Sequence, residues 1–242
     1  MSSIRTFLAG CTTMAAALAA VFALAGAKAP TSHVHFDEIT VGRIDIVEPD
    51  GTKRLILSNR SQYPGSFVEG KEIARPDRRD VAGLLFINDE GTENGGLVYD
   101  GTKKTDGTVN ADLSLTFDRF RQDQALQLSH YDDQKSSTSA LKINDIPSYT
   151  VTSVDDLMKI SADARKMPAA ERETYYTRLR DEGRLSRNRV FLGTTDDSSS
   201  SLTLKDGMGK PRMQLLVTAQ GRAEIRMLDA DGKVIKTVTP DS

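Results

Sequence analysis

Cysteine is almost absent from this sequence of 242 residues. The single cysteine, Cys11, lies within an apolar run near the N-terminus, and none follows it. Disulfide bonds and thiolate metal sites are therefore excluded from the rest of the chain. The domain that follows the apolar run must depend on its own packing for stability.

Several motifs of catalysis and nucleotide binding are also missing. The sequence has no G-x-S-x-G nucleophile motif and no Gly-rich phosphate loop. Its three histidines are His33, His35 and His130, and a zinc site would need all three to converge or a carboxylate such as Asp132 to replace one. We therefore predict no metal and no cofactor, and we assign no catalytic residue.

The charge of the chain argues against a nucleic-acid partner. Among 32 basic and 34 acidic residues, only two basic ones lie within residues 1–29. Without that segment 30 basic residues remain against 34 acidic ones, which is a net charge of −4. Domains that bind nucleic acids usually carry a basic surface, so we expect no nucleic acid as a partner.

The N-terminus has the features of an export signal. An uncharged run of 22 residues, from Thr6 to Ala27, follows a basic residue and ends in the small residues Ala25-Gly26-Ala27. As a helix the run is also long enough to cross a bilayer core of about 30 Å. Residues 1–29 are therefore predicted to be a signal peptide or an N-terminal hydrophobic helix that anchors the chain. We expect an exported protein on the periplasmic side of the inner membrane, anchored through residues 6–27 or released.

Alternating hydrophobicity dominates residues 30–242, the predicted exported domain. In Leu113-Ser114-Leu115-Thr116-Phe117 and in Ser201-Leu202-Thr203-Leu204, apolar residues occupy every second position, which is typical of half-buried strands. Acidic residues followed by glycine, as in Asn88-Asp89-Glu90-Gly91, separate such segments and are typical of tight hairpins. We predict a mainly β domain, an antiparallel hairpin meander closed as a sandwich or as an irregular barrel.

The period changes to that of a helix between residues 153 and 184. Ser153 is a suitable N-cap for a first helix, which Pro168 ends. Proline also suits the start of a second helix, and Gly183 suits its end. We predict an α-helical hairpin, residues 153–184, inserted between two β parts.

Three segments resemble a known group of proteins. They are GLLFINDEGTENGGLVYDG at Gly83–Gly101, FDRFRQDQALQL at Phe117–Leu128, and the tail from Arg189 to Val238. The chain resembles a group of uncharacterised bacterial proteins that have an N-terminal membrane segment and a β-rich exported domain. The resemblance covers most of the chain, and it implies no activity and no catalytic residues.

Polar side chains gather around two of the expected hairpin turns. The candidate ligand-binding residues are Asp89, Glu90, Glu93, Asp118, Arg121 and Asp123. Paired carboxylates about 5 to 10 Å apart can act as acid and base in glycoside hydrolysis, and an arginine between them can tune their pKa values. The same residue types are also typical of ordinary hairpin turns. We predict a non-enzymatic binding or structural module of the cell envelope, with a glycan or an envelope protein as its partner, and an envelope glycan hydrolase as the alternative.

A third interpretation concerns the helical insertion. Residues 165–189 contain eight basic and four acidic residues. A basic helix with aromatic anchors, here Tyr175 and Tyr176, can contact anionic lipid headgroups. Solvated helix faces carry charges in the same way. Contact with the membrane surface through the helical insertion is therefore the third alternative.

Overall fold

The structure of the protein is a computed structural model that describes residues 33–240. The chain divides into two compact units, residues 1–40 and residues 41–242. The predicted export segment, with its N-terminal hydrophobic helix, lies outside the described residues. Residues 33–40 contain no helix or strand. Within residues 33–240, no helix combines the length and the apolar character needed to cross a membrane.

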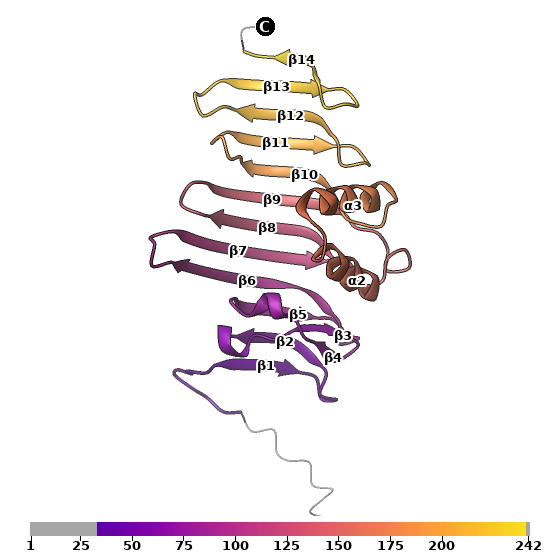
Figure 1. Cartoon of the computed structure of the whole chain (residues 1–242). Coiled ribbons are helices and arrows are strands. Elements are labelled where there is room, and N and C mark those ends of the chain that lie inside the picture. The colour runs from indigo at the N-terminus through magenta and orange to yellow at the C-terminus, as the bar shows by residue number, and fades with distance from the viewer. Residues whose placement is uncertain (1–32, 241–242) are drawn as a thin grey trace, which may run out of the picture. The chain divides into compact units, whose positions relative to one another are not determined.

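Twelve strands of the second unit form one antiparallel sheet (Figure 1). They are β1 (Arg43–Val47), β2 (Lys53–Ser58), β5 (Ala82–Ile87), β6 (Glu93–Lys103), β7 (Val109–Asp118), β8 (Gln124–Asp132), β9 (Ser137–Asp145), β10 (Arg187–Thr194), β11 (Ser200–Lys205), β12 (Pro211–Val217), β13 (Ala223–Leu228) and β14 (Val234–Val238). A separate hairpin consists of β3 (Ser66–Val68) and β4 (Lys71–Ile73), and it is flanked by the short 3-10 helices η1 (Arg60–Gln62) and η2 (Pro76–Arg78). The order of the strands in the sheet follows their order in the chain, so the predicted antiparallel meander is confirmed.

The sheet is open, which differs from the predicted sandwich or irregular barrel. Within the described part of the chain, the edge strands β1 and β14 each pair with one neighbour and not with each other. Figure 1 shows the twelve strands as a single layer. Closing a barrel requires a defined tilt and stagger of the strands. Hydrophobic alternation specifies only the face on which each side chain lies, so it could not predict whether the edges of the sheet meet.

Tight glycine turns account for the meander. In four turns that combine acidic residues with a glycine, the backbone N–H of the glycine donates to the carbonyl oxygen three residues earlier, at distances between 2.9 and 3.2 Å. These glycines are Gly51, Gly91, Gly209 and Gly232, and all four have positive φ. Glycine adopts this backbone conformation without steric cost, so each turn reverses the chain and places the next strand beside the last.

The predicted helical hairpin is confirmed. Its helices are α2 (Val154–Ala164) and α3 (Ala169–Asp181). The Ser153 hydroxyl accepts a hydrogen bond from the backbone N–H of Asp156 at 3.1 Å, and the Asp156 carboxylate accepts one from the Ser153 N–H at 2.9 Å. This capping box satisfies two N–H groups that a helix leaves unpaired at its start. Pro168 precedes α3, and Gly183 follows it with a φ of 73°.

The buried core of the second unit lies mainly on one face of the sheet. Phe67 of β3 belongs to one buried cluster with Ile56, Leu85 and Ile87 of the sheet. The helical hairpin contributes buried side chains of its own, from Ile160, Ala164 and Leu179. We call the side of the sheet that carries the β3–β4 hairpin and the helices the helix-bearing face.

The opposite face carries a continuous row of aliphatic side chains. Successive cross-strand pairs join one residue from each of the twelve strands. In sheet order this row, the aliphatic ladder, is Ile44, Leu57, Leu84, Leu97, Leu115, Leu128, Leu141, Leu192, Leu202, Leu215, Ile225 and Val238. Successive residues of a strand point to opposite faces, so Leu57 and Leu84 point away from the side on which Ile56 and Leu85 meet Phe67. None of the twelve ladder residues is buried.

Candidate functional site

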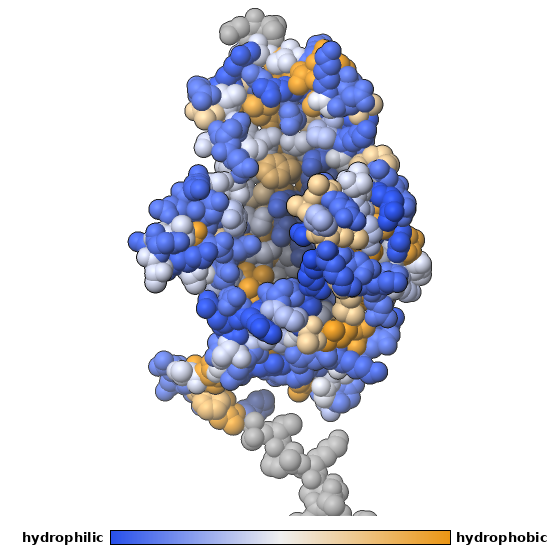
Figure 2. All heavy atoms as spheres, viewed as in Figure 1, coloured by the Kyte–Doolittle hydropathy of each residue, from blue (hydrophilic) through white to orange (hydrophobic). Residues whose placement is uncertain are grey.

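A cavity of about 620 Å³ lies between the sheet, the β3–β4 hairpin and α2. Leu85, Gly96, Ser114 and Thr116 of the helix-bearing face line it from the sheet. Because three of these residues are small, the sheet leaves space under the hairpin and the helix. On the face shown in Figure 2 the surface is largely hydrophilic and is hollowed beside the helices. The volume lies within the range of about 300 to 1,000 Å³ that is typical of ligand sites.

Four of the six predicted site residues line this cavity. They are Glu93, Asp118, Arg121 and Asp123. The other two, Asp89 and Glu90, lie on the β5–β6 turn and are not part of the lining. The Asp89 side chain is 93% exposed and forms an ion pair with Arg54. Glu90 accepts a hydrogen bond from Arg121 Nε at 2.7 Å, so it acts on the site only through Arg121.

Glu93 is held in place by a two-point ion pair with Arg78 of η2. Arg78 Nη2 donates to Glu93 Oε1 at 2.5 Å, and Nη1 donates to Oε2 at 3.0 Å. The two side chains are only 17% and 15% exposed. The Ser66 hydroxyl donates a third hydrogen bond to Oε2 at 2.8 Å. Because both carboxylate oxygens are occupied, Glu93 ties the β3–β4 hairpin and η2 to the sheet and is not free to act as a base.

Asp118 has the most unusual electrostatic environment of the predicted site residues. Burial, helped by the negative charges of Glu93 and Asp123, raises the pKa of Asp118 to about 7, while Arg78 opposes this effect. Its Oδ1 atom is buried and has no hydrogen-bond partner among residues 33–240. Carboxyl groups with strongly shifted pKa values concentrate at functional sites. A buried acceptor without a partner is also costly, and a bound molecule that donates a hydrogen bond would remove that cost.

Gln122 adds a second buried acceptor to the same cavity. Its side chain is 8% exposed, and its Nε2 atom donates to the carbonyl oxygen of Thr152, which fixes the orientation of the amide. The Oε1 atom is buried and, like Asp118 Oδ1, lacks a partner in the described part of the chain. Buried polar atoms are paired in the great majority of cases. A molecule with hydrogen-bond donors therefore matches the two acceptors.

Arg121 holds the β7–β8 turn against its neighbours. Its φ is 53°, a left-handed conformation that costs a residue other than glycine about 1–3 kcal/mol. Its guanidinium forms ion pairs with Glu69 and Glu90, both at 2.7 Å. It also lies 5.6 Å from the ring centre of Phe120 and 5.7 Å from that of Tyr149. These contacts offset the backbone strain and connect the turn to both the β3–β4 and the β5–β6 turns.

Sequence reasoning missed the basic and aromatic side of the cavity. Arg75 and Arg78 line it, and Arg75 Nη2 pairs with Asp77 Oδ2 at 2.7 Å, which lowers the pKa of Asp77 to about 2. Tyr63 also lines the cavity, and burial raises its pKa to about 12. The dense run of arginines around Pro76 was the available signal. Its position over the sheet depends on how the β3–β4 hairpin folds back, which no local pattern records.

The cavity can both accept and donate hydrogen bonds. Asp118 and Gln122 supply acceptors, and Arg75 supplies donors. Over residues 33–240, no group of three or more histidine, cysteine, aspartate and glutamate side chains is arranged to hold a metal ion. Of the three histidines considered above as zinc ligands, His130 lies on β8, and its Nδ1 atom is 2.9 Å from the hydroxyl of Ser139 on the neighbouring strand β9. The arrangement suits recognition of a polar molecule or proton transfer by Asp118.

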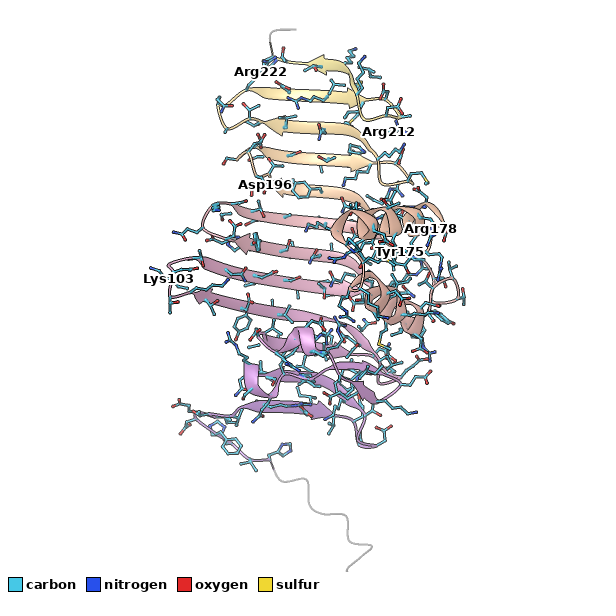
Figure 3. All side chains as sticks on the ribbon, viewed as in Figure 1. Lys103, Tyr175, Arg178, Asp196, Arg212 and Arg222 are labelled. Atoms are coloured by element: carbon cyan, nitrogen blue, oxygen red, sulfur yellow. The ribbon has the colours of Figure 1, made fainter. Side chains whose placement is uncertain are left out.

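The basic helical insertion has its charges largely engaged. On α3, Arg178 lies 3.8 Å from Glu182, and Arg180 lies 3.5 Å from Glu173. Arg178 also lies 5.5 Å from the ring centre of Tyr175. Figure 3 shows Tyr175 and Arg178 at the end of the strands opposite to the β6–β7 hairpin. These internal contacts describe a stabilised helix surface, and contact with a membrane through it stays a prediction.

Comparisons with known proteins identify no relative of this chain. No protein-family model matches the chain, and no curated protein matches it. The resemblance to exported bacterial β-rich proteins therefore stays a prediction.

Proposed function

We propose that this protein is a non-enzymatic binding module of the cell envelope, and that its cavity binds part of a glycan. The observation that carries the proposal is the pair of buried acceptors, Asp118 Oδ1 and Gln122 Oε1, which have no partner among residues 33–240. Hydroxyl groups donate hydrogen bonds and accept them, so a sugar can satisfy both atoms. Leaving such atoms unpaired costs about 1–3 kcal/mol each, which binding recovers.

Two other residues that line the cavity, Arg75 and Tyr63, support the same ligand class. Arg75 can donate to sugar oxygens. Tyr63 presents a ring that is largely buried and whose hydroxyl lies 3.5 Å from the carbonyl oxygen of Leu84. Sites that recognise sugars combine such apolar surfaces with a few oriented polar groups. A ligand with several hydroxyl groups on a compact ring fits this combination.

The predicted export segment sets the compartment of the proposed partner. With residues 1–29 directing export, the β domain acts on the periplasmic side of the inner membrane, where envelope glycans are accessible. A fusion of alkaline phosphatase to the C-terminus tests this location, because that enzyme is active only after export. Phosphatase activity of the fusion in intact cells is expected. A fusion that stays inactive while the chain is stably produced would contradict an exported module.

Binding can be tested with a matched pair of variants. The full chain, purified in detergent, is titrated calorimetrically with soluble muropeptides, the fragments that a muramidase releases from peptidoglycan. At pH 8, where the Asp118 carboxylate is ionised, we expect binding that Asp118→Asn weakens about tenfold or more, since a charge-assisted hydrogen bond contributes about 1.5–3 kcal/mol. The control Asp89→Asn, at an exposed turn outside the cavity, leaves the affinity unchanged. Equal affinities of all three proteins, or no binding at millimolar fragment concentrations, contradict the proposal.

A glycan hydrolase is the second candidate, and one observation favours it. A carboxyl group with a pKa of about 7, such as that of Asp118, suits a general acid near neutral pH. Arg78 and Ser66 occupy Glu93, and Arg75 occupies Asp77, so that Asp123 is the lining carboxylate left to activate water. In this scheme Asp118 protonates the leaving oxygen while Asp123 removes a proton from the attacking water. Release of reducing ends from peptidoglycan by the wild-type protein, and its loss in Asp118→Asn, would replace binding by hydrolysis as the function.

A further inference from the structure

The aliphatic ladder leaves a large apolar surface on the face opposite to the helices. Six of its members expose between 37% and 51% of their surface. They are Ile44, Leu57, Leu128, Leu192, Leu215 and Ile225. The next row on the same face includes Phe117, whose ring stacks on that of Phe86 with 6.4 Å between ring centres. Monomeric soluble proteins rarely expose apolar patches that extend over a whole sheet.

The internal core of the second unit is correspondingly small. Apart from Pro64, only eight apolar side chains are buried in residues 33–240. A domain of about 200 residues normally buries roughly 70% of the surface of its unfolded chain. A single-layer sheet cannot reach this, because one of its faces has nothing packed on it. We therefore expect the aliphatic side chains of the ladder to be buried against a further layer, with which they would form a second hydrophobic core.

We propose that a second copy of this chain covers the ladder, so that two sheets pack face to face as a β-sandwich dimer. The ladder is suited to a partner identical to itself, because all twelve of its residues are aliphatic and uncharged. Such a row matches its own copy under a two-fold rotation, which is the commonest symmetry of homodimers. Two stacked sheets lie about 10 Å apart, a spacing that interdigitated leucine and isoleucine side chains fill.

The area of the ladder face meets the requirement of a stable dimer. Twelve strands at about 4.8 Å spacing extend over roughly 53 Å. Three side-chain rows along each strand, with about 6.8 Å between rows, add a width of roughly 17 Å including the side chains. The product is roughly 900 Å² for each copy and 1,800 Å² for the pair. Stable interfaces typically bury about 1,600 Å² in total.

Two other occupants fit the face less well. A lipid surface is disfavoured by charge, because residues 30–242 carry a net charge of −4, which repels anionic headgroups. The apolar run from Thr6 to Ala27 is too small to cover the face. A helix of its 22 residues is about 33 Å long and about 10 Å wide.

The test measures the association of the full chain by sedimentation equilibrium in density-matched detergent. We expect a dimer of the wild-type chain. Leu128→Lys and Leu192→Lys each place two charges in the interface of a symmetric dimer, and we expect them to raise the dissociation constant about 100-fold or more. Tyr131→Lys is the matched control, since Tyr131 lies on the same strand as Leu128, is 39% exposed and points to the helix-bearing face. It should leave the dimer unchanged.

Folding of the variants is checked by far-ultraviolet circular dichroism. Leu128→Thr is the second test variant, because a β-branched residue keeps the strand while removing aliphatic contact, and we expect it to weaken the dimer about tenfold. If all the ladder variants still dimerise as the wild type does, the dimer contact lies elsewhere, for example in residues 6–27, and the proposal is wrong. A monomeric wild-type chain overturns it as well, and binding of that monomer to phospholipid vesicles would assign the face to lipid.

Discussion

Replacing Asp118 by asparagine should change how the stability of the protein depends on pH. The pKa of Asp118 is about 7 in the folded chain, and its ordinary value, which applies to the unfolded chain, is 3.8. Between these values the folded chain holds a proton that the unfolded chain has lost. The free energy of unfolding therefore falls as the pH rises from about 4 to 7. At 1.36 kcal/mol per pKa unit, the loss from this group is about 4 kcal/mol.

In the Asp118→Asn variant the side chain at this position is uncharged at every pH, so this loss of unfolding free energy should be absent. Urea unfolding of the two full-length proteins, followed by circular dichroism between pH 4.5 and 8, measures the difference. We expect similar stabilities at pH 4.5 and a variant that is more stable than the wild type by up to about 3 kcal/mol at pH 8, because part of the loss already occurs below pH 4.5. Carboxylates with lowered pKa values, such as Asp45 and Asp77, act in the opposite direction at lower pH and cancel in the comparison. Parallel stability curves would refute the raised pKa of Asp118 on which the hydrolase mechanism depends.

The same urea titration at pH 7 tests three further substitutions. Gly95→Ala should destabilise the fold by more than about 2 kcal/mol, because Gly95 has a φ of 116° and a Cβ atom there would overlap the carbonyl oxygen of Thr116. A loss of stability below about 1 kcal/mol would show that the backbone of β6 shifts to make room for the methyl group. Ser153→Ala should cost about 1 kcal/mol through loss of the capping box, with reduced helical signal, and an unchanged signal would argue against the cap. Arg78→Ala should cost about 3–5 kcal/mol because it leaves Glu93 buried without its partner; a smaller loss than that of Ser153→Ala would mean that water reaches Glu93.

Elements with local signals could be predicted from the sequence. The helical hairpin follows from an N-cap at Ser153, a break at Pro168 and a stop at Gly183, and each of these features acts only on the few residues next to it. The hairpins follow from glycines that adopt positive φ after acidic residues. Closure of the sheet could not be predicted in this way, because it depends on tilt and stagger accumulated over twelve strands.

The candidate site was predicted in part. Glu93, Asp118, Arg121 and Asp123 were recognisable as a polar group on two neighbouring hairpin turns, and these four do line one cavity. The carboxylate of Asp89 belongs to the same turn sequence but lies outside, since the turn directs it to solvent.

Residues brought from a distance in the chain were missed. Arg78 reaches Glu93 only because the β3–β4 hairpin and η2 fold over the sheet. Gln122 becomes a buried acceptor only because Thr152, thirty residues further along, holds its amide. Both contacts are properties of the tertiary structure, and neither leaves a periodic trace in the sequence.

The sequence by itself determined that this is an antiparallel β meander with one apolar face, because side chains alternate across a strand with a period of two residues. It also determined where the helices interrupt the meander, because helix caps are local. Only the tertiary structure decided that the sheet stays open in a single layer, that its helix-bearing face encloses a cavity around Asp118, and that the aliphatic ladder remains uncovered. The physical reason is that alternation assigns a side chain to a face, whereas the cover on that face depends on contacts between segments, or between molecules, that are remote in sequence.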